Sequence, residues 1–190
     1  MVITYHGDNY FKIQSGNFTA LIDPTDSRSF RGADLVLSTL KPSPVPPPKE
    51  EGVFWVDHQG EYEVKDAVVR GMSAGVERGD GKTIYRITLE GITVLILGHL
   101  GHEPSPEVQE NFKGAQVVIV PAGGKPFISE EAAARLIRQI EPALVIPSLS
   151  KNFKNFLKEM GKDKCPVEEK LTFKAKDLEA GKMAVRCLAS

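Results

Sequence analysis

The sequence predicts an α/β protein in which two β-sheets pack face to face and helices cover their outer sides, a four-layer αββα sandwich. Two observations support this architecture. Up to residue 97 the chain is made mostly of short apolar or alternating segments separated by turn residues, which is typical of strands. From residue 105 onward, amphipathic helical segments alternate with short apolar runs, which is typical of helices packed on a sheet.

The first half of the chain predicts a series of strands. Ser15-Gly16-Asn17 and Glu90-Gly91 are predicted hairpin turns, because Gly and Asn tolerate positive φ. Asp23-Pro24 ends the third strand. The predicted strands are Val2–Tyr5, Tyr10–Gln14, Phe18–Ile22, Leu35–Ser38, Val53–Val56, Glu61–Val64, Ala67–Gly71, Thr83–Leu89 and Thr93–Leu97.

The second half predicts helices between buried strands. Ser105 and Ser129 each precede a proline or acidic first turn, so both are expected N-caps. The second of these helices should run to Ile140, and Ser150 should cap a further helix through Met160. The predicted strands are Gln116–Val120, Ala143–Ile146, Val167–Phe173 and Met183–Leu188.

A proline-rich segment interrupts the strands between residues 41 and 49. Proline fixes φ and cannot donate a ladder hydrogen bond, so we expect an extended loop here. Its core, the Pro-rich loop 42–48, is either a rigid connector or a docking element for a partner protein.

Composition limits the cellular location and the kinds of partner that we expect for this protein. The formal net charge of −1 gives no reason to expect nucleic acid or an anionic membrane as a partner, and no apolar run approaches the length of a membrane span. The N-terminal residues show no signal-peptide pattern. Cys165 and Cys187 lie in no ligand-like spacing, so we expect two free thiols in a cytoplasmic protein.

Seven stretches, in order along the chain, resemble the metallo-β-lactamase-fold hydrolases, in particular a branch of short, uncharacterised Zn-dependent hydrolases. The resemblance covers nearly the whole chain and implies one metallo-β-lactamase-like domain over residues 1–190, with a site at one edge of the sandwich. The stretches are Ile3–Gly7, Thr19–Pro24, Ala33–Thr39, Gly60–Val64, Leu97–His102, Val117–Pro121 and Val145–Ser148.

The same resemblance shows where this chain departs from the family. Family members carry a Thr-His-x-His-x-Asp-His loop that binds one or two zinc ions, a Gly-Asp that bridges them and a late histidine. The corresponding loop begins at Thr39, and the ligand positions become Leu40, Pro42, Pro44, Val45, His99 and Leu149. Zinc requires about three or four nitrogen, sulfur or oxygen donors, and only His99 offers one. We therefore expect no metal cofactor and none of the inherited metal-dependent catalysis.

Four residues remain as a candidate residual site: His99, His102, His58 and Asp23. A rebuilt zinc site on His58, His99 and His102 is the alternative to polar side chains left around an emptied cleft. Asp23 is expected to have a structural role, accepting backbone hydrogen bonds in the turn after its strand.

Three functional hypotheses follow. The first is a non-catalytic binding or regulatory protein whose partner is an unknown protein or small molecule. The second is a divergent metal-dependent hydrolase with a relocated site around His99 and His102. The third is a partner-binding module that uses the Pro-rich loop 42–48.

Overall fold

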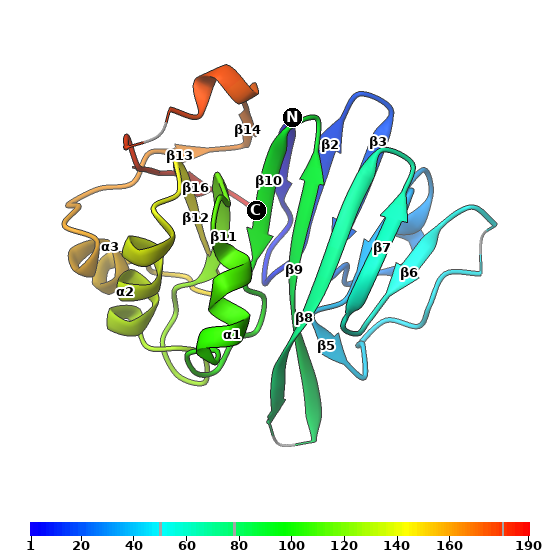
Figure 1. Ribbon diagram of the computed structural model, residues 1–190, viewed down its shortest axis with the longest axis horizontal. Helices are drawn as coiled ribbons and strands as arrows, with labels where there is room; N and C mark the ends of the chain where they lie inside the picture. Colours follow the sequence, from blue (N-terminus) through cyan, green and yellow to red (C-terminus); the bar gives the residue numbers. More distant parts are fainter. Residues whose placement is uncertain (50, 78, 180) are drawn as a thin grey trace.

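In the computed structural model, which describes residues 1–49, 51–77, 79–179 and 181–190, two large sheets pack against each other (Figure 1). The first sheet has the strand order β14-β1-β2-β3-β4-β6. Its strands are β1 (Val2–Tyr5), β2 (Phe11–Ser15), β3 (Phe18–Ile22), β4 (Leu35–Leu37), β6 (Phe54–Val56) and β14 (Lys170–Thr172).

The second sheet has the order β15-β12-β11-β10-β9-β8-β7, and β5 (Leu40–Lys41) pairs with β9. Strands β10, β11 and β12 lie side by side in parallel and are buried at every position, which explains their continuous apolar sequences. The strands are β7 (Gly60–Val64), β8 (Ala67–Glu77), β9 (Asp80–Leu89), β10 (Ile92–Ile96), β11 (Val117–Pro121), β12 (Leu144–Ser148) and β15 (Ala184–Val185).

Helices α1 (Pro106–Gln109), α2 (Glu130–Ile140) and α3 (Lys154–Glu159) lie together on the outer side of this second sheet (Figure 1). Ser129 caps α2 as predicted, since its side chain accepts a hydrogen bond from the Ala132 N–H. The predicted cap at Ser150 is wrong. That hydroxyl accepts from the backbone N–H of Asn152 instead, and α3 starts at Lys154.

The hydrophobic core consists of three clusters of buried residues. The largest fills the space between the two sheets, the second lies under the helices, and the third covers the outer face of the first sheet. The third cluster packs Val45 and Phe30 of the short 3₁₀ helix η1 (Ser27–Phe30) on Leu21 and Val36. The remaining 3₁₀ helices are η2 (Glu110–Phe112) and η3 (Ala175–Asp177). The predicted four-layer αββα architecture is confirmed, with a thin outer layer over the first sheet.

Several predicted strands have different limits. Strand β8 continues past Gly71 to Glu77, and its far half pairs with the start of β9 in a hairpin that projects beyond the sheets (Figure 1). The predicted strand Val167–Phe173 is two strands, β13 (Val167–Glu168) and β14, and Met183–Leu188 is likewise β15 and β16 (Cys187–Leu188).

The prediction of two free thiols is wrong, because Cys165 and Cys187 form a disulfide. Parallel pairing of β13 with β16 sets Val167 opposite Cys187 and brings the two cysteine Cα atoms to 5.7 Å, which is within the usual range for a disulfide. Free thiols were part of the case for a cytoplasmic location, which stays a prediction. Within the described ranges, none of the helices is long and apolar enough to cross a membrane.

Candidate functional site

Three strand ends build the centre of the site. Strands β3 and β4 run parallel with Ile22 opposite Leu37, so Asp23 and Thr39, which follow them closely, emerge at the same edge of the first sheet. His99 follows β10 of the second sheet. The two sheets are joined nearby, since the buried Tyr85 hydroxyl of β9 donates a hydrogen bond to the Ser38 carbonyl at 3.0 Å.

Asp23 and His99, both predicted site residues, are connected through the Thr39 hydroxyl. Thr39 Oγ1 lies 2.5 Å from Asp23 Oδ2 and 2.7 Å from His99 Nδ1. The other carboxylate oxygen of Asp23 accepts the Thr39 backbone N–H at 2.6 Å, and Asn9 Nδ2 donates to Oδ2 at 2.6 Å. Asp23 thus accepts hydrogen bonds as an anchoring residue, but its backbone donor is Thr39 after strand β4 and not, as predicted, the turn that follows its own strand.

Gly98 makes this arrangement possible. Its φ of +57° is in the left-handed region, and a Cβ at this position would lie only 2.5 Å from the Thr39 Cβ. A larger residue here would push Thr39 out of its position between Asp23 and His99.

Burial dominates the electrostatics of the pair. Burial raises the pKa of Asp23, and His99 together with the hydrogen bonds from Thr39 and Asn9 offsets part of that rise. Burial lowers the pKa of His99, an effect that Asp23 opposes and that the nearby Lys82 adds to. The imidazole is therefore neutral at neutral pH.

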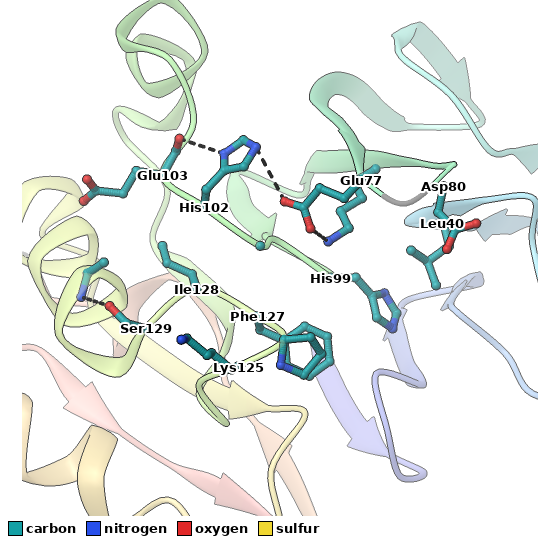
Figure 2. Close-up of a pocket in the computed structure, with 14 residues that line it drawn as sticks. Leu40, Glu77, Asp80, His99, His102, Glu103, Lys125, Phe127, Ile128 and Ser129 are labelled. Atoms are coloured by element: carbon teal, nitrogen blue, oxygen red, sulfur yellow. Dashed lines mark hydrogen bonds and ion pairs between the residues drawn. The ribbon is translucent and has the colours of Figure 1, made fainter.

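A cleft of about 960 Å³ opens beside His99 (Figure 2). The rings of His99 and Phe127 lie side by side, with centroids 5.9 Å apart. The projecting β8–β9 hairpin forms one wall, where Lys82 Nζ pairs with Glu77 Oε2 at 2.5 Å. The Glu77 carboxylate sits against Gly101, in the space that a side chain would need.

The other two predicted histidines lie apart from the centre of the site. His102 lines the same cleft as His99, but its side chain is exposed and its Nε2 is 3.5 Å from Glu77 Oε1. His58 lies at a different pocket, where its Nδ1 is 2.8 Å from Asp57 Oδ1. Among the residues that the structure describes, no group of three or more His, Cys, Asp or Glu side chains is placed to hold a metal ion.

Comparison with known proteins identifies the family. Residues 2–148 match the model of the β-lactamase superfamily domain. The chain belongs to this family. A search of curated proteins gave no match.

Solved structures of the superfamily share the fold. A protein from Thermotoga maritima, proposed to be a Zn-dependent hydrolase of the metallo-β-lactamase superfamily, is 22% identical, with a TM-score of 0.79 over 98% of this chain and 97% of that one. A proposed metal-dependent hydrolase from Parabacteroides distasonis is 14% identical, with a TM-score of 0.69 over 97% and 91%. An isothiocyanate hydrolase from Delia radicum gut bacteria is 15% identical, with a TM-score of 0.69 over 92% and 100%. At these identities the likeness concerns the fold alone.

The residues at the family's ligand positions do not fit a dinuclear zinc site. Leu40 lines the cleft beside His99, whereas Leu149 lines a second cleft of about 940 Å³. Val45 is buried in the outer cluster against Phe30, on the far side of the first sheet. None of these side chains carries a donor atom, and Nδ1 of His99 is already bound to Thr39.

The Pro-rich loop 42–48 is anchored by the burial of Val45, while Pro44, Pro46 and Pro47 are exposed. This placement is compatible with a docking element and equally with a rigid connector. The loop therefore stays one of the open hypotheses.

Sequence reasoning missed four residues of the site: Thr39, Asn9, Lys82 and Phe127. Thr39 is the first residue of the loop that corresponds to the family's ligand motif, and that position was the available signal for it. The other three come from distant parts of the chain, and only the folded arrangement brings them to His99.

Proposed function

We propose that this chain has lost the dinuclear zinc site of its family and acts as a non-catalytic binding protein, taking a small molecule in the cleft beside His99. One observation carries the proposal. Of the six positions at which the family binds its metals, His99 alone has a donor side chain, and Thr39 and Asp23 hold that side chain through Nδ1. This hydrogen-bonded chain gives the imidazole a fixed orientation that needs no metal ion.

Elemental analysis tests the proposal. Protein purified without an affinity tag and offered zinc, manganese and iron should hold close to no metal, and it should not hydrolyse esters, lactones or phosphodiesters. An occupancy near one ion per chain would overturn it if that occupancy is lost in His99→Ala or His102→Ala and kept in the control His6→Ala, whose side chain does not line the cleft.

That contrary result would support the alternative, a divergent metal-dependent hydrolase with a relocated site. His99 and His102 line one cleft, and this shared location is the observation in favour of the alternative. With only two histidines available there, such a site would need further ligands from water or from a movement of the hairpin that carries Glu77.

A further inference from the structure

The two ring nitrogens of His99 have different surroundings. Nδ1 lies 2.7 Å from Thr39 Oγ1, whereas no described residue forms a hydrogen bond with Nε2. The side chain is 17% exposed and lines the cleft, and Nε2 is not among the buried polar atoms that lack a partner. Nε2 is therefore open to the cleft.

The count of hydrogens along the chain of contacts fixes the tautomer. Asp23 as a carboxylate can only accept, so the single hydrogen of the Thr39 hydroxyl is donated to Asp23 Oδ2. The short contact between Thr39 Oγ1 and Nδ1 then requires that Nδ1 carry a hydrogen and donate it. In the neutral imidazole this leaves Nε2 as a hydrogen-bond acceptor.

The surroundings hold this arrangement rigidly. Thr39 is fully buried, and Asp23 has three hydrogen-bond donors from Thr39 and Asn9. Because these contacts fix the ring before a ligand arrives, little ordering entropy is lost when Nε2 accepts a hydrogen bond.

The walls of the cleft near His99 favour an uncharged, partly apolar ligand. Phe127 contacts the imidazole, and Leu40 and Ile128 line the same cleft. The charged residues in the lining carry both signs and give no large excess of one charge. Lys82 is paired with Glu77, and Glu103 is paired with Arg135. The lining also contains Asp80 and Lys125.

We propose that the cleft binds an uncharged planar molecule, whose N–H or O–H group donates a hydrogen bond to Nε2 of His99 and whose ring lies against Phe127. This inference rests on the proposed function, because a metal ion bound at Nε2 would take the same lone pair.

Nitrogen NMR of ¹⁵N-labelled protein tests both parts of the inference. In the protein alone, long-range nitrogen–proton correlations should show His99 as the Nδ1–H tautomer with a pyridine-type Nε2. Titration with phenol should shift the Nε2 resonance of His99. Anisole has the same ring without the donor, and it should leave this resonance in place.

Variants connect the binding to Nε2. His99→Phe should weaken phenol binding about five-fold, the loss expected for one neutral hydrogen bond. The control His6→Ala, an exposed histidine outside the lining of the cleft, should bind as the parent does. Thr39→Val removes the bridging hydroxyl while keeping the side-chain volume, so the remaining His99 should become a mixture of tautomers. The Thr39→Val spectrum keeps the tautomer testable if His99→Phe does not fold.

Four results would overturn the inference: a His99 Nε2–H tautomer in the parent, equal shifts with phenol and anisole, no phenol shift at all, or a stronger response to inorganic phosphate than to phenol. Metal content measured on the same samples distinguishes a failure of the proposed function from a failure of the proposed ligand class. Bound zinc refutes the proposed function, whereas metal-free protein that gives one of these four results refutes only the ligand class.

Discussion

Reducing the Cys165–Cys187 disulfide should cost this protein a large part of its stability. The bond closes a loop with a sequence separation of 22 residues. This loop contains β14, the edge strand of the first sheet, and β15, the edge strand of the second. The disulfide therefore restrains the segment that supplies an edge strand to each of the two sheets.

The loop length sets the size of the effect. The chain-entropy model for a loop of this length gives about 3.4 kcal/mol at 25 °C, because the oxidised unfolded chain has fewer conformations than the reduced one. For a domain of this size, each 1 kcal/mol changes Tm by roughly 2–4 °C, so reduction should lower Tm by about 7–14 °C.

Urea unfolding with and without a thiol reductant measures this difference, and thiol titration confirms the redox state. The slope m should be larger for reduced protein, since its unfolded state is more expanded. Cys165→Ser is the matched control: it should reproduce the reduced stability and should not respond to reductant. A difference below about 1 kcal/mol between fully oxidised and fully reduced protein would refute the reasoning.

Three further predictions concern the site and the contact between the sheets. Gly98→Ala should destabilise the protein by about 2–4 kcal/mol in urea unfolding, because φ is positive and the new Cβ would clash with Thr39. The control Gly91→Ala also has a positive φ but open space around it, so it should cost only about 1 kcal/mol. Burial lowers the pKa of His99, so below about pH 6.5 the unfolded chain takes up a proton that the folded chain does not. The free energy of unfolding should therefore fall below this pH, and it should fall less in His99→Phe. Equal pH profiles of stability for the two proteins would contradict this. Tyr85→Phe should cost about 1–2 kcal/mol through loss of the buried hydroxyl contact between the sheets, and an unchanged unfolding midpoint would show that the contact contributes nothing.

Local patterns in the sequence predicted the elements whose form depends on local chemistry. Helix α2 was predicted at its observed limits, because a Ser N-cap and acidic first turn precede its amphipathic face. Strands β1 and β3 were also predicted at their observed limits. Strand β8 was predicted too short, since Gly71, Ser73 and Gly75 weaken its strand pattern while long-range pairing with β9 extends it.

The segment after residue 165 shows what a linear pattern cannot provide. Val167–Phe173 reads as one strand, yet β13 pairs with β16 and β14 pairs with β1 of the first sheet. The disulfide depends on the β13–β16 pairing, so nothing in the spacing of Cys165 and Cys187 could predict it.

In the candidate site, the loss of metal ligands and the presence of His99 are physically consistent with each other. Family members carry at this position a carboxylate that bridges two metal ions. In this chain His99 Nδ1 lies 3.5 Å from Asp23 Oδ2, and the side chain of Asp23 is only 8% exposed. A second carboxylate so close to Asp23, without metal ions to compensate the charge, would be strongly unfavourable. A neutral imidazole avoids that repulsion and donates a hydrogen bond to Thr39 in its place. A histidine at position 99 is therefore compatible with the buried Asp23 at this edge of the sandwich, and under the proposed function the ligand would meet its Nε2.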